Sequence, residues 1–128
     1  MAMTGAISPS LHQLARDGNI EEATKIITDE NVVEKDKHQR TALHLAVWAK
    51  KLDFVKFLLS HKNCDVHAEA ADQTTALHFA AQGGNLEIVE ILIKHGAKVN
   101  SRAGKIQKTP LMMAASKGHL DIVKYLIS

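Results

Sequence analysis

The sequence predicts an all-α fold, a solenoid of about four helix–turn–helix repeats joined by short hairpin-like loop tips. One observation is a six-residue block that recurs every 34 residues, opening at Thr41, Thr75 and Thr109. Another is a second, apolar block that follows each of these at the same offset, beginning at Leu52, Leu86 and Leu120. Self-similarity at a fixed period of this length is the sequence signature of repeat architectures.

Local signals divide each repeat into a first helix, a tight turn and a second helix. A threonine hydroxyl can accept a hydrogen bond from a free backbone N–H at a helix start, and Pro110 stands where its missing N–H costs nothing. The segment Gly83–Asn85 supplies the turn in one repeat, and Lys117–His119 supplies it in the last. The second helix over 86–93 carries one apolar face, which a single helix pair cannot bury, so neighbouring pairs must stack.

The repeats fill one domain over 1–128. A weaker copy of the two blocks, Leu11–Ala15 and Ile20–Ile27, predicts an N-terminal capping repeat at about 5–35. The remaining repeats are predicted at 36–69, 70–103 and 104–128. Because the last helix is as apolar as the internal ones, we expect either a further repeat beyond Ser128 or self-association through this end.

Composition narrows the class of protein. The 128 residues are 45% apolar, enough for a core, and 16 Lys and Arg against 14 Asp and Glu leave a net charge of +2. That charge is too small to indicate a nucleic-acid or membrane-surface protein. No apolar run approaches the roughly 18 residues of a membrane span. The single cysteine, Cys64, cannot form an internal disulfide, which favours a cytoplasmic or nuclear setting.

The repeated blocks resemble the ankyrin repeat family. The resemblance rests on Thr-Ala-Leu-His at Thr41 and Thr75, on Thr-Pro-Leu at Thr109, and on the tail Gly96–Asn100. The sequence departs from the family where glycine is expected: Gln39, Gln73 and Gln107 stand at the tips and Lys50 in the second repeat's turn. Met112 replaces a histidine. The resemblance implies that His44 and His78 tie adjacent loops together through hydrogen bonds.

The resemblance also implies that a partner binds on the concave side, formed by the loop tips and the exposed positions of the first helices. Carried over residue by residue, the contacts are Arg16, Lys35, Lys37, His38, Arg40, Trp48, Asp72, Thr74, Gln82, Lys105, Ile106, Lys108 and Lys117. The tips are basic in the second repeat, mildly acidic in the third and basic in the fourth. This pattern predicts a partner segment with acidic groups toward both ends of the groove. The competing interpretation is that the loop lysines are only solvated.

Trp48 is the one tryptophan of the chain. The resemblance places it at a position open to partners, and Val47 before it takes the packing position, so we expect partial exposure rather than burial. Aromatic anchors often dominate interface energies, so its truncation is expected to weaken binding by roughly 2 kcal/mol.

The sequence offers no convergent catalytic or metal-binding motif. Successive His12, His44 and His78 stand one repeat apart, on the order of 10 Å, which is too far for shared zinc coordination. Cys64 is expected to be an incidental loop or core residue. We therefore predict no enzyme activity and no cofactor.

The predicted function is a protein–protein interaction module or scaffold, expected to be part of a larger intracellular protein. One alternative is a nucleic-acid-binding adaptor that uses Lys35, Lys37, Arg40, Lys105 and Lys108, and without interleaved aromatic residues that signal is weak. A metal-dependent enzyme fragment ranks below it. Fold alone does not identify the partner.

Overall fold

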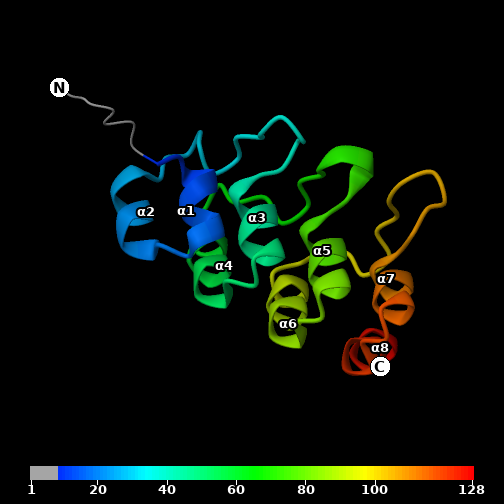
Figure 1. Cartoon of the computed structure of the whole chain (residues 1–128). Helices are drawn as coiled ribbons and strands as arrows, with labels where there is room; N and C mark the ends of the chain where they lie inside the picture. Colours follow the sequence, from blue (N-terminus) through cyan, green and yellow to red (C-terminus); the bar gives the residue numbers. More distant parts are fainter. Residues whose placement is uncertain (1–8) are drawn as a thin grey trace.

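The computed structural model describes residues 9–128, so the first four residues of the predicted capping repeat lie outside the described part. Within that part the chain forms four helix pairs, followed from blue to red in Figure 1. The helices are α1 (Leu11–Asp17), α2 (Ile20–Ile26), α3 (Ala42–Trp48), α4 (Leu52–Leu59), α5 (Ala76–Gly83), α6 (Leu86–Lys94), α7 (Pro110–Ser116) and α8 (Leu120–Ile127), with a short 3₁₀ turn η1 (Ala71–Gln73). The predicted all-α fold is confirmed.

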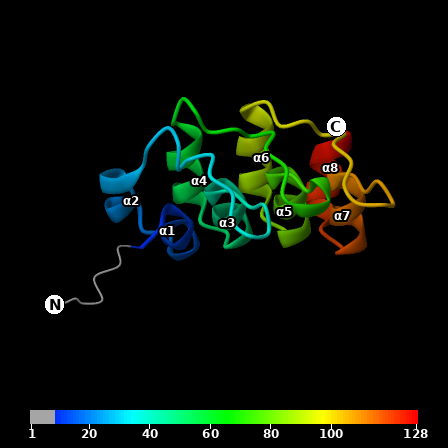
Figure 2. The same ribbon diagram turned by 90° about the horizontal axis from the view of Figure 1, so that it is seen from above.

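The helix pairs stack side by side in chain order. Seen from above, α1, α3, α5 and α7 form one row and α2, α4, α6 and α8 form a second (Figure 2). We call these the inner and outer helices. The three long loops that lead into α3, α5 and α7 project to one side as tips (Figure 1). None of the described helices is long and apolar enough to cross a membrane.

The inner helices α3, α5 and α7 begin where the threonines predict. The hydroxyls of Thr41 and Thr75 each accept the backbone N–H of a histidine three residues later, and the histidine ring closes a reciprocal capping box. The hydroxyl of Thr109 accepts the N–H of Met112 at the start of α7, without a reciprocal box, and Pro110 stands at the first helical position. These side chains satisfy backbone groups that a helix end leaves unpaired.

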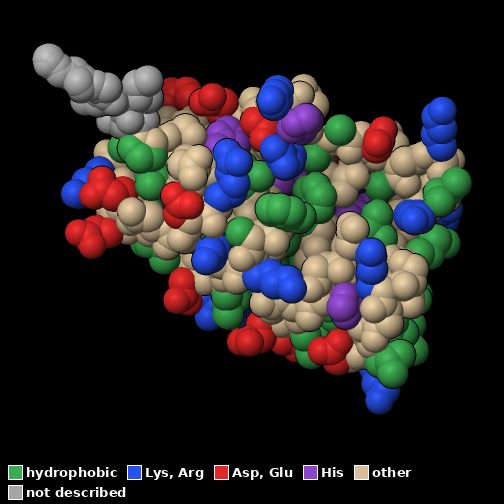
Figure 3. All heavy atoms as spheres, in the orientation of Figure 1, with side chains coloured by type: hydrophobic (Ala, Val, Ile, Leu, Met, Phe, Trp, Pro, Cys, Tyr) green, Lys and Arg blue, Asp and Glu red, His purple; other side chains and the backbone are tan. Residues whose placement is uncertain are grey.

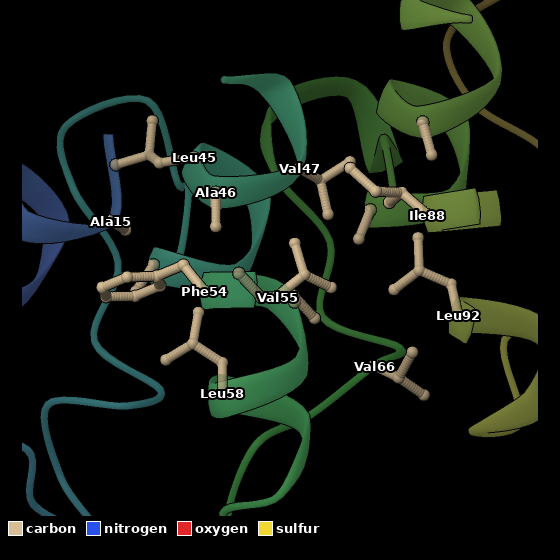
Figure 4. Close-up of a cluster of buried hydrophobic side chains, with 14 of the residues drawn as sticks. Ala15, Leu45, Ala46, Val47, Phe54, Val55, Leu58, Val66, Ile88 and Leu92 are labelled. Carbon is tan, nitrogen blue, oxygen red and sulfur yellow. The ribbon is translucent and has the colours of Figure 1, made fainter. Parts of the chain in front are cut away.

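The core lies between the two rows. Phe54, Val55 and Leu58 of α4 pack beneath Ala46 and Val47 of α3, and the contact continues to α6 (Figure 4). All five residues are buried. Apart from Ala115 in the last repeat, the alanines of the inner helices have almost no exposed surface, which lets neighbouring inner helices approach closely. Burial of apolar surface by neighbouring repeats is therefore what holds the stack together.

The four positions where glycine is absent keep the backbone conformation that glycine favours. Gln39, Gln73 and Gln107 have φ values of 64°, 64° and 55°, and Lys50 has 60°. A non-glycine residue in this left-handed region costs roughly 1 kcal/mol. The substitutions leave the turns in place at that local cost.

Candidate protein-binding surface

The predicted contact residues lie on the inner helices and tips, and most are accessible. Eleven of the thirteen are exposed, whereas Arg40 and Thr74 are half-buried. Figure 3 shows this face, with lysine and arginine side chains around a group of hydrophobic side chains near its middle. The surface is thus built from four consecutive repeats rather than from one.

Backbone hydrogen bonds hold successive tips together. The N–H of Ala71 donates to the carbonyl of His38 at 3.2 Å, and the N–H of Gly104 donates to that of Asp72 at 2.7 Å. The two acceptor residues stand 34 residues apart, so equivalent positions of successive repeats make equivalent hydrogen bonds between neighbouring tips. Lys35 adds a hydrogen bond from Nζ to the carbonyl of Glu69 at 2.8 Å. The tips therefore form one connected edge of the surface.

The tip of the second repeat is built around Asp36, which the sequence analysis did not single out. Its carboxylate accepts the backbone N–H groups of His38 and Arg40, and the Nε–H of Arg40 at 3.0 Å. Burial alone would raise the pKa of Asp36, but these hydrogen bonds and the guanidinium charge lower it below its ordinary value. Arg40 is therefore engaged within its own tip. An Asp four residues before Arg40 is a sequence signal from which this turn could have been predicted, because Asp side chains commonly accept backbone N–H groups of the residues that follow them.

The fourth tip is a short hairpin. Ala103 and Lys108 exchange both backbone hydrogen bonds, at 2.9 and 2.8 Å. Between them Lys105 and Ile106 are exposed, with 71% of the Ile106 surface accessible. This tip presents an aliphatic side chain between two cations.

The loop ties implied for the histidines form at His78. Its Nδ1 accepts the N–H of Thr75, so the proton is on Nε2, which donates to the carbonyls of Lys108 at 2.9 Å and Ser101 at 3.1 Å. His12 makes the matching bond to the carbonyl of Arg40 at 3.0 Å. Burial lowers the pKa of His78 despite the attraction of the two carbonyls.

At His44 the expected tie is not made. Its Nε2 is fully buried and has no hydrogen-bond partner among the described residues. Burial lowers the pKa of His44 to about 4, and the carbonyls of Ala68 and Thr74 offset part of that effect without forming an aligned bond. The ring packs edge-on against Phe79, with centroids 5.5 Å apart. His44 therefore contributes through its capping box and its packing.

Trp48 is 64% exposed, which confirms the sequence prediction. It lies at the edge of a shallow pocket of about 360 Å³ lined by Trp48, Lys50, Phe79, Gln82, Gly83 and Lys117. Three of these residues were predicted as contacts, and the structure brings them together. Lys50, Phe79 and Gly83 were not predicted as contacts. We call this hollow the Gly83 pocket.

Charge is unevenly distributed between the two sides of the molecule. The inner helices with their turns and tips, residues 11–18, 35–50, 69–84 and 103–118, carry eight Lys and Arg against four Asp and Glu. The rest of the chain carries eight against ten. The inner side is thus net positive and the outer side net negative, although the whole chain is close to balance. This polarity favours an acidic partner on the inner side.

The outer helices carry a larger hollow of about 520 Å³ between α4, α6 and α8. Two lysines and two glutamates line it together with apolar side chains, so opposite charges balance. It lacks both the exposed tryptophan and the net charge of the inner side. We therefore place the candidate site on the inner side despite the smaller hollow.

Cys64 is half-buried beside the core, and burial raises the pKa of its thiol to about 12. Such a thiol carries almost no thiolate at neutral pH, so it is a poor nucleophile. Across residues 9–128, no three His, Cys, Asp or Glu side chains come together in a way that could hold a metal ion.

Helix hairpins that stack in chain order, with their tips joined along one edge, define a helical repeat protein with one extended inner surface. A family model described as ankyrin repeats (3 copies) matches residues 8–70 and 62–128, and the chain belongs to the ankyrin repeat family. No curated protein matches the chain. Ankyrin repeats are in general protein–protein interaction modules and are typically not enzymes.

Proposed function

We propose that this chain binds a partner protein along its inner side and acts as an interaction module or scaffold. The thirteen predicted contacts outline the surface, with the Gly83 pocket near its centre. The partner presents an acidic segment to it. The proposed setting is cytoplasmic or nuclear, where an unpaired Cys64 thiol stays reduced.

The observation that carries this proposal is the exposure of Trp48 beside Lys50 and Lys117, which form no ion pair within the described residues. Both lysines line the same hollow as Trp48, and none of the salt bridges found within residues 9–128 involves either of them. Tryptophan is one of the residue types enriched at the energetic centres of protein interfaces. Unpaired cations around it give both attraction and orientation for a negatively charged partner.

The test is photo-crosslinking of the intact chain in cells, followed by affinity measurement with the partner so identified. Trp48→Ala is expected to weaken binding by about 2 kcal/mol, close to thirtyfold. Leu120→Ala is the matched control, because Leu120 is also a large exposed apolar side chain but lies on outer helix α8. Equal affinities for the wild type and Trp48→Ala, with unchanged circular dichroism, would remove the inner side as the binding surface.

The nucleic-acid alternative makes a different prediction for the same surface. Lys37, Lys105 and Lys108 are exposed on the tips, whereas Lys35 and Arg40 are already engaged with Glu69 and Asp36. Binding through phosphates would fall steeply with salt and would not depend on Trp48. Retention of a labelled single-stranded RNA at 150 mM salt, lost on Lys105→Gln and Lys108→Gln, would favour this alternative over the protein partner.

Self-association through the fourth repeat is a separate proposal. Met112, Leu120 and Ile127 are exposed there, and Val123 and Leu126 are half-buried. Contact between two such faces would bury apolar surface. Sedimentation velocity at rising concentration should then show a dimer, and a monomer at all concentrations contradicts it.

A further inference from the structure

The Gly83 pocket lies at the one of two turn positions where the third repeat has glycine and both neighbouring repeats have a side chain. Ala49, Gly83 and Lys117 occupy equivalent positions in the second, third and fourth repeats, as do Lys50, Gly84 and Gly118. Gly83 lines the hollow together with Lys50 and Lys117 and has no side chain to fill it. The hollow therefore lies over α5 of the third repeat, between a cation of the second repeat and a cation of the fourth.

The two glycines differ in what the fold requires of them. Gly84 has φ +85°, and a Cβ there would come within 2.6 Å of the His119 ring, so the turn and the packing both need glycine. Gly83 is the last residue of α5 and is not in the left-handed region. A Cβ at Gly83 would meet only Cε of Lys50, at an ordinary 3.5 Å. The fold does not require glycine at Gly83, where alanine would be the better helix former.

The walls of the pocket are aromatic and its flanks are cationic. Trp48 from α3 and Phe79 from α5 provide the apolar surface. No carboxylate lines the pocket, and neither Lys50 nor Lys117 is in an ion pair within the described residues. Apolar walls take an apolar side chain, and unpaired ammonium groups beside them take carboxylates.

We propose that the Gly83 pocket anchors one large apolar side chain of an acidic partner segment, with Asp or Glu of that segment on either side of it contacting Lys50 and Lys117. This rests on the proposed function and adds the chemistry of the partner. The segment crosses the inner helices from repeat to repeat, because Lys50 and Lys117 belong to different repeats on either side of α5.

The experiment selects peptides from a random twelve-residue display library on the intact chain and measures their affinity by Trp48 fluorescence, which is clean because the chain has one tryptophan. The expected consensus is a Leu, Ile, Phe or Met with Asp or Glu on both sides. Replacing that apolar residue by Ala should weaken binding at least roughly tenfold. Lys50→Gln with Lys117→Gln should flatten the salt dependence.

Gly83→Met is the decisive variant, because its side chain fills the pocket at a position whose backbone tolerates it. We expect it to weaken the selected peptide at least roughly tenfold, as truncation of the peptide's anchor does. Gly83→Ala is the matched control and should change the affinity little. Circular dichroism and thermal melting check that both variants fold.

Three results would overturn the proposal: no peptide selected, a consensus without an apolar residue between acids, or unchanged affinity of Gly83→Met. The outcome is separable from that of the proposed function. If Trp48→Ala loses the crosslinked partner but Gly83→Met still binds it, the proposed function holds and the proposed role of the pocket is refuted. If selected peptides bind the pocket but Trp48→Ala still captures the cellular partner as well as the wild type does, the proposed function is refuted and the pocket still binds peptides of the expected chemistry.

Discussion

The third and fourth repeats have nearly the same apolar pattern but bury it to different extents. Leu92 of α6 is fully buried, whereas the equivalent Leu126 of α8 is half-buried. Ala81 is buried and Ala115 exposed. His78 has no exposed surface, whereas Met112, which replaces it, is 51% exposed. The third repeat packs between two neighbours and the fourth against one, so the neighbour decides burial.

Truncating the equivalent leucines should give the largest difference between the two repeats. Leu92→Ala is expected to lower the free energy of unfolding by about 4 kcal/mol, because it opens a cavity between two repeats. Leu126→Ala should cost about 1 kcal/mol, since the side chain already meets solvent on one side. Urea unfolding monitored by circular dichroism measures both. Similar losses would break the comparison.

Acid should destabilise the repeats that carry buried histidines. The unfolded chain takes up protons as the pH falls below about 6.5, while His44 stays neutral in the folded chain until about 4, so unfolding is favoured across this window. The expected loss from His44 is about 3 kcal/mol between pH 6.5 and 4. The lowered pKa of His78 acts in the same direction.

The measurement is the free energy of unfolding against pH for the wild type and for His44→Gln with His78→Gln. The double variant should show a distinctly flatter curve between pH 6.5 and 4. Met112→Gln, in the fourth repeat, serves as control and should leave the slope as it is. A wild-type curve that is flat in this window would contradict the assigned burial of the two rings.

Much of this arrangement could be predicted from the sequence. The 34-residue period predicted the helix pairs, and the threonines predicted the starts of α3, α5 and α7 within one residue. The exposure of Trp48 followed from Val47 occupying the packing position. Local periodicity and capping are short-range properties, so residues near in sequence suffice to reveal them.

The pocket and the tip contacts could not be predicted in this way. Lys50 and Lys117 meet one hollow only because α3, α5 and α7 stack with a particular spacing. The tie missing at His44 depends on where one loop places two carbonyls. Asp36 resembles any exposed tip carboxylate until its three hydrogen bonds are seen. These are long-range or fine geometric features that a repeat pattern does not encode.

The smallest expected effects concern the tips, where the third and fourth repeats should respond equally to the same substitution. Gln73 and Gln107 both hold left-handed backbone at their tips, with φ of 64° and 55°. Replacing either with glycine should stabilise the chain by about 0.5 kcal/mol, because relief of strain slightly exceeds the entropy cost of glycine. Thermal melting of the two variants should give equal shifts. A clear difference would mean that neighbours, not local backbone, set the tip energy.

The central claim is that each repeat is held by the repeats on either side of it, which leaves the inner side free for a partner. Native-state hydrogen exchange of backbone amides tests this most directly. Amides of α6 should exchange at least tenfold more slowly than the equivalent amides of α8, because α6 is covered by outer helices on both sides. Equal protection of α6 and α8 would contradict the claim.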